Sequence, residues 1–342
     1  MIYFLHISKC AGSSFVDLAK RNIRLFRPNA NGNPLNPITS KRFSFWHWNA
    51  DEQRYLLASP SCDLIANESH LGRHAQFHDR ITYVTILRDP IDRLFSYYQF
   101  NHSRPDAATP LEERGRAFAR FLKREQTVDW RRNSLVTALT YPARKEKSVA
   151  ARLDLAKQRL EQFDHVILME ELSQQVNVFA QYGWRSLDIG WRKAIGHSET
   201  AFSWSAARTA LARHKRTLDA LIAANEADLE LYSFARELVR RRKSKTPPLN
   251  RTAMHRERSM PESENFDFLC YCAYDSFLSG KKQTCRELLT RAGKCPAAGV
   301  LDNGGNAGFV EFALARFAAP EAAEEERSAR SQQRVRLLTE TV

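Results

Sequence analysis

Two segments with the same layout, residues 3–15 and 84–98, constrain the fold of this chain more than any other feature. Each segment starts with an apolar run typical of a strand buried on both faces, passes through a short polar turn and enters a helix. Each turn offers backbone N–H groups, hydroxyls and one cation, and such groups bind phosphate at a helix N-terminus. The repeated layout predicts one sheet with two phosphate-binding turns, and a ligand that carries phosphates at both ends.

The first turn spans residues 8–13 and leads into a helix that is expected to begin near Ser13. Gly12 lets the backbone approach an anion closely, and Ser13 and Ser14 add hydroxyl donors. Lys9 adds a full positive charge, but it precedes the glycine and no lysine follows, so the triphosphatase motif G-x-x-x-x-G-K-[ST] is absent. The alternative interpretation is an ordinary strand, turn and helix with a surface lysine.

The second turn spans residues 88–90, at the end of the clearest strand of the chain. Pro90 suits the first turn of a helix, and Asp89 before it suits the N-cap. Arg88 stands where an α/β sheet places its ligand crevice, and Ser96 follows about two helical turns later. A phosphate could bind between them. The alternatives are a salt bridge from Arg88 to a nearby aspartate, and a Ser96 hydroxyl bonded back to its own helix.

The rest of the chain alternates apolar runs and amphipathic stretches, which predicts an α/β fold with a mainly parallel central sheet flanked by helices. Strands are expected at residues 2–7, 64–66, 81–87 and 166–169, and helices at 111–125, 149–163 and 171–182. Residues 205–243 are expected to form one long helix or two. A boundary is expected after Pro248, which gives a domain of residues 1–248 and a helical C-terminal extension of residues 249–342. Within that extension, residues 273–296 have the rhythm of a helical hairpin and resemble one tetratricopeptide-like unit, followed by a tail.

The chain of 342 residues carries a net charge of +13, which favours anionic partners such as a phosphorylated cofactor, an acidic glycan or a membrane surface. Its six cysteines are scattered and match neither a disulfide framework nor a zinc motif. If Met1 is the native start, there is no signal peptide, and no apolar run is long enough to span a bilayer. We therefore expect a soluble, cytoplasmic protein. A Golgi location would require an anchor upstream of this sequence.

Together the two turns resemble the cofactor-binding loops of sulfotransferases that use 3′-phosphoadenosine 5′-phosphosulfate (PAPS). His6-Ile-Ser-Lys-Cys-Ala-Gly-Ser-Ser14 is similar to the H-I-P-K-[TC]-[GA]-G-[TS]-[ST] loop of the heparan sulfate 2-O- and 6-O-type enzymes and their bacterial relatives. Ile86-Leu-Arg-Asp-Pro-Ile-Asp-Arg-Leu-Phe-Ser-Tyr-Tyr98 is similar to their L-R-[DN]-P-x-x-R-x-x-S-x-[YF] element. The likeness extends over about residues 1–245, and Ser8 and Ala11 depart from the family pattern.

The resemblance implies a P-loop-like sulfotransferase fold and in-line transfer of a sulfuryl group from PAPS to a hydroxyl, with no metal ion. Lys9 would stabilise the bridging oxygen as charge builds there. The 5′ end would lie in a cradle formed by Cys10, Ala11, Gly12, Ser13 and Ser14. Arg88 and Ser96 would hold the 3′-phosphate through charge-assisted bonds.

The proton of the acceptor hydroxyl needs a base, and histidine is the natural choice near neutral pH. The resemblance places this role on His70, which follows the strand before the second turn. His74 is the second candidate and Glu68 the third, because glutamate serves as base in other glycan sulfotransferases. The alternative for His70 is a loop histidine bonded to backbone.

The acceptor implied by the resemblance is a carbohydrate, which could be acidic. Two basic groups could line a groove for it: Arg131, Arg132, Arg144, Lys145 and Lys147, and the run from Arg240 to Lys245. The alternative is a solvated helix face. Trp46, Trp48 and Trp130 could stack on sugar rings or lie in the core. Peripheral association with a membrane stays open, whereas no nucleic-acid-binding motif is present.

Two other functions remain open. A P-loop-type nucleotide kinase would use the same phosphate-binding physics, although the Walker lysine is missing. A catalytically inactive sulfotransferase-like binding protein would keep the fold and the ligand without the reaction. Binding and turnover of PAPS separate these alternatives from the enzyme.

Overall fold

The computed structural model describes residues 1–25, 28–42, 48–57, 63–68, 70–71, 81–101, 113, 116–121, 132–141, 147–189, 215–243, 260–295, 311 and 313–315. The chain divides into two compact units. The first comprises residues 1–34 and 45–258, and the second comprises residues 35–44 and 259–342. The predicted boundary after Pro248 lies outside the described residues. No sequence pattern indicated that residues 35–44 belong with the C-terminal unit.

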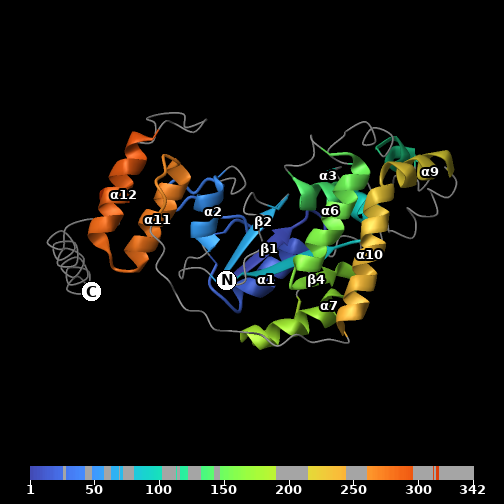
Figure 1. Cartoon of the computed structure of the whole chain (residues 1–342), viewed down its shortest axis with the longest axis horizontal. Coiled ribbons are helices and arrows are strands. Elements are labelled where there is room, and N and C mark those ends of the chain that lie inside the picture. The colour runs from blue at the N-terminus through green and yellow to red at the C-terminus, as the bar shows by residue number, and fades with distance from the viewer. Residues whose placement is uncertain are drawn as a thin grey trace, which may run out of the picture. The chain divides into compact units, whose positions relative to one another are not determined.

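The first unit is built on a parallel sheet of four described strands in the order β2-β1-β3-β4 (Figure 1). Their bounds are β1 Ile2–His6, β2 Leu64–Glu68, β3 Thr82–Leu87 and β4 His165–Leu168. All three strand pairs are parallel, and helices lie in the connections from β1 to β2 and from β3 to β4. The predicted α/β fold with a parallel sheet flanked by helices is therefore confirmed, and the expected strands are present within one or two residues.

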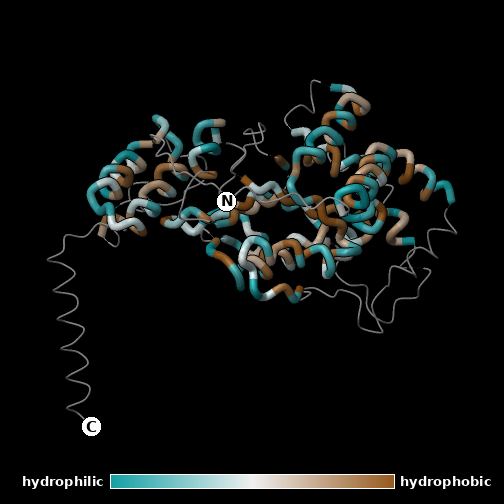
Figure 2. Tube along the Cα trace, turned by 60° about the horizontal axis from the view of Figure 1, so that its bottom comes forward, coloured by the Kyte–Doolittle hydropathy of each residue, from teal (hydrophilic) through white to brown (hydrophobic). Residues whose placement is uncertain are grey.

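Helices surround this sheet. They are α1 Gly12–Lys20, α2 Ala50–Leu57, α3 Pro90–Asn101, α5 Ser134–Thr140, α6 Val149–Gln162, α7 Leu172–Gln175, α9 Lys215–Ala224 and α10 Glu226–Lys243. Figure 1 shows α6 and α10 running side by side. Figure 2 shows hydrophobic and hydrophilic residues alternating along the helices, as expected where one face of each helix is buried. The described part of the chain contains no helix with the length and apolar character that crossing a membrane requires.

The structure corrects one helical prediction and, for residues 205–243, shows the two-helix alternative over the part that it describes. The expected helix over residues 171–182 is mostly 3₁₀: η4 Met169–Glu171 and η5 Val176–Tyr182 flank the single α-helical turn of α7. Residues 215–243 form two helices, α9 and α10, which meet at Asn225. The side chain of Asn225 donates to the carbonyl of Leu221, so this residue ends the first helix with its own amide.

Aromatic side chains pack on both faces of the sheet because successive strand residues point to opposite sides. On one face, Phe4 of β1 contacts Phe15 of α1, with ring centroids 4.5 Å apart. On the other face, Tyr3 contacts Tyr83 of β3 at 5.5 Å, and Tyr83 contacts Phe163 at 5.9 Å. Both faces of the strands that lead into the two turns are therefore fixed by packing.

The topology places the two turns at a switch point. From β1 the chain passes to β2 on one side, whereas from β3 it passes to β4 on the other side. Because β1 and β3 are neighbours, the connections that leave their carboxyl ends diverge and leave a crevice between them. The first and second turns both stand at this crevice.

Helix α3 is anchored by an aromatic cluster, which we call the α3 cluster: Leu94, Phe95, Tyr98, Phe118, Phe121 and Leu221, all buried. Leu94, Phe95 and Tyr98 lie on one face of α3. The rings of Phe95 and Phe118 meet edge to face at 5.4 Å. This packing fixes the rotation of α3 about its axis, so the opposite face, which carries Ser96, is held toward the first turn.

Asp228 of α10 caps helix α5 from outside that helix. The backbone N–H groups of Leu135 and Val136 each donate to its carboxylate at 2.9 Å. Asn133 precedes α5 in a left-handed conformation and provides no side-chain cap of its own. Burial raises the pKa of the Asp228 carboxyl, while the two N–H donors and Arg93 act against that rise. The fully buried carboxylate thereby joins α5 to α10.

Replacing Asp228 with alanine is expected to lower the unfolding free energy of the first unit by about 1–3 kcal/mol, because two buried N–H groups lose their acceptor. Asp228→Asn keeps one acceptor oxygen and should lose less. All six tryptophans lie between residues 46 and 204, so urea unfolding followed by tryptophan fluorescence reports on this unit. The control is Asp154→Asn on the exposed face of α6. An unchanged midpoint for Asp228→Ala would contradict the capping role.

The second unit contains a helical hairpin, α11 Phe266–Leu278 and α12 Lys282–Lys294. Gly280 in the connection has φ +73°, a left-handed conformation that glycine adopts without strain. Asn36 ties residues 35–44 to this hairpin, because its amide donates to Asp267 at 2.6 Å. The predicted hairpin is present, although its first helix begins seven residues before the expected start at residue 273.

Candidate functional site

The first turn holds its backbone in a rare conformation. Lys9 and Ala11 have φ values of +69° and +61°, in the left-handed region. That conformation costs a non-glycine residue about 1–2 kcal/mol, so the surrounding structure must impose it. At Ala11, where the family pattern has glycine, the chain thus keeps the same backbone turn with a less suited residue. Such stored strain is typical of functional turns.

Helix α1 starts at this turn with unused donors. The N–H groups of Ser14 and Phe15 donate to the carbonyl of Ala11 at 3.1 and 3.2 Å. Those of Gly12 and Ser13 make no hydrogen bond to another described residue, and neither does the hydroxyl of the buried Ser14. Unpaired N–H groups at the positive end of a helix of nine residues are suited to bind an anion.

Gly12 is required here by close packing. A Cβ atom added to it would lie 2.6 Å from Cγ of His6 and closer still to other ring atoms. The His6 ring is only 4% exposed and stacks on Phe4. Its Nδ1 lies 3.0 Å from the carbonyl oxygen of Asn31, which can only accept, so this nitrogen carries the proton. His6 therefore fills the space beside the start of α1.

An asparagine-rich loop supports the first turn. Ser13 donates to Oδ1 of Asn31 at 3.0 Å, and the amides of Asn31 and Asn33 both donate to Oε2 of Glu68, at 3.0 and 3.1 Å. Glu68 in turn donates its backbone N–H to Asn33 at 2.7 Å. The carboxylate of Glu68 thus holds this loop, which argues against its role as the base.

The second turn is positioned by the predicted cap and by a residue that follows β4. Asp89 accepts from the N–H groups of Ile91 and Asp92 at 2.9 and 3.1 Å, which confirms it as the N-cap of α3. Its own N–H donates to Oε1 of Glu170 at 3.3 Å. Tyr232 of α10 donates to Oε2 of the same carboxylate at 2.6 Å. Burial and Glu170 both raise the pKa of Tyr232, so its hydroxyl stays protonated and keeps donating.

The structure brings Lys9 and Arg88 together. Nη1 of Arg88 lies 3.5 Å from the backbone carbonyl of Lys9, so the two turns are in contact across the crevice. Ser96 is half-buried, and its hydroxyl makes no hydrogen bond among the described residues, so the alternative of a bond to its own helix is not observed. The predicted phosphate-binding residues Lys9 and Arg88 therefore lie close together at the carboxyl ends of β1 and β3.

Cys10 lies in the first turn as a neutral thiol. It is buried, and this burial raises its pKa to about 11, although Arg93 and Arg88 act in the opposite direction. Because the thiol keeps its proton at neutral pH, it does not repel an anion at the turn. Arg93 of α3 is 6% exposed, and its Nε has no hydrogen-bond partner among the described residues.

His70 lies just beyond the end of β2, at the same edge of the sheet as the two turns. Its carbonyl accepts from the amide of Asn67 at 2.6 Å, and the next residue, Leu71, donates to the carbonyl of Ala138 at 2.7 Å. The imidazole packs against the ring of Tyr141, with centroids 4.0 Å apart. The carbonyl of His70 and the N–H of Leu71 are thus both held by hydrogen bonds. His74 lies outside the described residues.

The structure gives less support to the residues that were predicted to bind the carbohydrate acceptor. Trp48 is buried in the core, and Trp46 and Trp130 lie outside the described residues. Arg240 pairs with Glu237 at 2.6 Å. Arg242 donates to the carbonyls of Glu161 and Phe163 at 2.8 and 2.6 Å, so it caps the end of α6. Arg132 and Lys147 are exposed, while Arg131, Arg144, Lys145, Ser244 and Lys245 lie outside the described residues.

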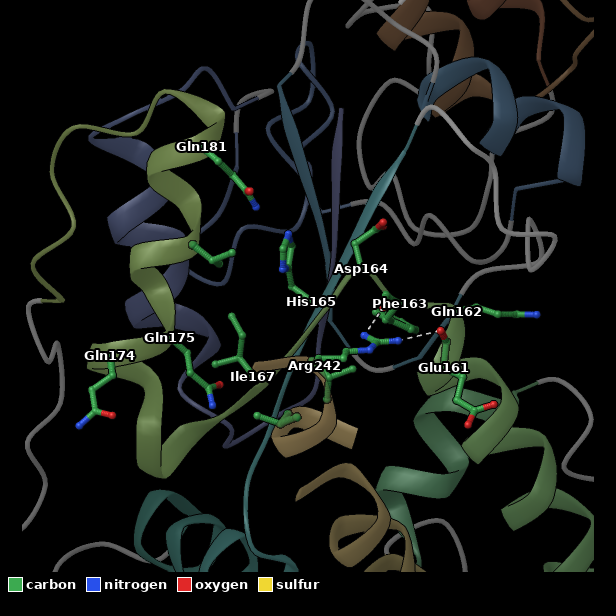
Figure 3. Close-up of a pocket in the computed structure, with 13 residues that line it drawn as sticks. Glu161, Gln162, Phe163, Asp164, His165, Ile167, Gln174, Gln175, Gln181 and Arg242 are labelled. Carbon is green, nitrogen blue, oxygen red and sulfur yellow. Dashed lines mark hydrogen bonds between the residues drawn. The ribbon is translucent and has the colours of Figure 1, made fainter. Parts of the chain in front are cut away.

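A groove of about 540 Å³ lies beside the start of β4, between α7, η5 and α10 (Figure 3). Figure 3 shows His165 and Arg242 on its floor, with Gln175 and Gln181 beside them. Its polar groups bond within the chain: His165 lies 2.6 Å from the hydroxyl of Tyr182, and Gln175 accepts from the N–H of Leu168. Burial lowers the pKa of His165 to about 4. This groove is at the amino end of β4, opposite the edge that carries the two turns.

Sequence reasoning missed several residues that shape the crevice. No role was predicted for Asn31 or Asn33, although the cluster of asparagines around Gly32 was an available signal. Arg93 and Phe100 flank Ser96 on α3 at spacings of three and four residues, which the helical period would have placed on one face.

Comparison with known proteins agrees with this geometry. No curated protein matches the chain. The model of the sulfotransferase family matches residues 1–235, which include the whole described sheet, both turns and part of α10. This match covers more than half of the chain, so the protein, whose two turns meet at the β1–β3 switch point, belongs to the sulfotransferase family.

Proposed function

We propose that this protein transfers the sulfuryl group of PAPS to a hydroxyl of a carbohydrate acceptor, in the manner of the heparan sulfate 2-O- and 6-O-type enzymes that its turns resemble. The observation that carries the proposal is the contact of the two turns across one crevice, with Arg88 against the carbonyl of Lys9. A nucleotide with phosphates at both ends needs two anion sites at a short, fixed distance. Membership of the sulfotransferase family supports the reaction class.

The residues present fit such a donor. The unpaired N–H groups of Gly12 and Ser13 and the hydroxyl of Ser14 would bind the 5′-phosphosulfate at the N-terminus of α1. Arg88 and Ser96 would bind the 3′-phosphate. A residue larger than glycine at position 12 would overlap the ring of His6, so only glycine lets the backbone N–H groups keep these positions.

The bound donor would supply the sulfuryl group and a phosphate leaving group. The ammonium of Lys9 would stabilise the negative charge that develops at the bridging oxygen. His70 would accept the proton of the acceptor hydroxyl from the neighbouring end of β2. Cys10, as a neutral thiol, would leave the positive field of Arg88 and Arg93 available to the anion. In this scheme Lys9 supplies the positive charge at the bridging oxygen, so no described residue has to bind a metal ion.

Calorimetric titration with 3′-phosphoadenosine 5′-phosphate (PAP) tests the proposal. Arg88→Ala is expected to weaken binding roughly 10- to 100-fold, because charge-assisted hydrogen bonds contribute about 1.5–3 kcal/mol. The control is Arg216→Ala on the exposed face of α9, which removes the same charge away from the crevice. The control should bind like the wild type.

ATP provides the second comparison. Weak binding of ATP beside tight binding of PAP would support the sulfotransferase over the nucleotide kinase. Equal binding of the two would favour the kinase, and no binding of PAP would contradict the proposal. Binding of PAP without transfer to any polysaccharide would favour the inactive, ligand-binding alternative.

A further inference from the structure

One face of α3 turns a stripe of three residues toward the first turn. Arg93, Ser96 and Phe100 follow one another at spacings of three and four residues, so they lie along one face of the helix. The opposite face packs into the α3 cluster, which fixes the direction of the stripe. Arg93 acts electrostatically on Cys10 of the first turn, and Ser96 is the predicted 3′-phosphate ligand. Phe100, at the far end of the stripe, has no role in the proposed function.

Phe100 contacts the lysine that the proposed function makes catalytic. Nζ of Lys9 stands over the ring of Phe100, 3.9 Å from its centroid, well inside the range of cation–π interactions. The ring is 56% exposed, so its position is not explained by burial in the core. An exposed aromatic ring in contact with an ammonium group is suited to hold that group in place.

The contact between Phe100 and Lys9 is one of two contacts that hold Lys9. The chain segment that follows β3 holds Lys9 at two points: Arg88 contacts its backbone carbonyl, and Phe100 contacts its ammonium group. A lysine side chain has many rotamers, and fixing it at the moment of reaction costs conformational entropy. A ring that fixes it beforehand reduces this cost, which is how preorganised groups raise a reaction rate.

We propose that Phe100 is a positioning residue for Lys9, and that its ring holds the ammonium group where it meets the bridging oxygen of the sulfuryl donor. This inference rests on the proposed function, since it assigns Phe100 to the same site. Phe100 acts through Lys9 and needs no contact with the donor. The contact also joins the two turns, because Lys9 belongs to the first and Phe100 to the helix that carries the second.

The contact itself is measurable without activity. In protein labelled with ¹³C-lysine, the Hε protons of Lys9, assigned with Lys9→Arg, are expected upfield of the other lysines because they lie over an aromatic face. Phe100→Leu should remove this shift, whereas Phe100→Tyr should retain it. A Lys9 resonance at the ordinary lysine position in the wild type would overturn the proposal.

The role is measured by the slow transfer of the sulfuryl group from PAPS to water, which breaks the bond to the bridging oxygen and releases sulfate and PAP. Phe100→Leu should lower this rate about two- to tenfold, the range of one cation–π contact, with PAP affinity unchanged. Phe100→Tyr should restore the rate. In a Lys9→Ala background, Phe100→Leu should cause no further loss.

Two results would overturn the positioning role: an equal loss in the wild-type and Lys9→Ala backgrounds, or a Phe100→Tyr variant as slow as Phe100→Leu. Either would mean that the ring acts only through packing. Failure of the proposed function has a different signature. The wild type would then neither bind PAP nor release sulfate from PAPS, while the Lys9 shift would still report the contact.

Discussion

Alanine in place of His70 is expected to lower turnover about 10²- to 10⁴-fold and to leave the affinity for PAP unchanged. The reason is that His70 stands beyond β2, whereas the groups proposed to bind phosphate belong to the turns after β1 and β3. Removing the base affects the acceptor proton and not the nucleotide. Turnover would be measured as PAP release with a heparan-type polysaccharide, and affinity by calorimetry.

Two further variants separate the base from a packing role. Tyr141→Leu removes the ring that packs against His70 and keeps the imidazole. It should reduce turnover far less than His70→Ala. His70→Gln keeps a hydrogen-bonding side chain of similar reach but cannot accept and release a proton near neutral pH, so it should be as slow as the alanine variant.

The pH profile gives an independent readout for the same residue. A histidine base must be deprotonated, so wild-type turnover should fall on the acid side, where an imidazole takes up a proton. That acid limb should be absent from the residual activity of His70→Ala. Near-normal turnover of His70→Ala would exclude it as the base. Attention would then move to His74.

The elements that local chemistry specifies could be predicted from the sequence. The strand before each turn is a continuous apolar run, and such runs indicate strands buried on both faces. Asp89 and Pro90 predict the start of α3 because a cap and a fixed φ act within a few residues. The start of α1 was predicted within one residue from the apolar residues Phe15, Leu18 and Ala19 on one helical face, although no side chain caps this helix. These signals need no knowledge of distant parts of the chain.

The parts that depend on contacts between distant residues could not be predicted. Asp228 caps a helix more than ninety residues before it in the chain, and no local pattern marks that pairing. Asn31 and Asn33 bind Glu68 only because the sheet places β2 beside β1. Residues 171–182 read as an α-helix because periods of 3.0 and 3.6 residues are hard to distinguish over so short a segment.

The candidate site also combines features that the local sequence predicts with features that depend on distant contacts. The residue types of the two turns and their positions at strand ends predicted an anion crevice, because the topology of parallel sheets brings such ends together. The reason for Gly12 was different from the expected one. The sequence suggested close approach of backbone to an anion, and the structure adds a second cause, the ring of His6. This second cause leads to a sharp prediction.

Substituting alanine for Gly12 is expected to weaken PAP binding about 100-fold or more, since a misplacement of about 1 Å in a binding site can cost that much. The new Cβ would overlap the ring of His6. That ring cannot move freely, because it stacks on Phe4 and bonds to the carbonyl of Asn31. The N-terminus of α1 must therefore shift, and its N–H groups would leave the positions in which they bind the 5′ end. Overpacking should also lower the unfolding free energy by about 1–3 kcal/mol.

The control is Gly183→Ala, because Gly183 has φ +82° and a Cβ atom added there would meet no other atom within 4 Å. That variant should lose stability through backbone strain and still bind PAP like the wild type, which separates binding from general destabilisation. A double variant, His6→Ala with Gly12→Ala, makes room for the new methyl group and should recover part of the lost affinity. If Gly12→Ala alone bound PAP with wild-type affinity, the overlap with His6 would not control the cradle. Recovery of PAP affinity in the double variant would instead show that His6 and Gly12 together set the position of α1. The packing of His6 would then control the geometry of the first turn.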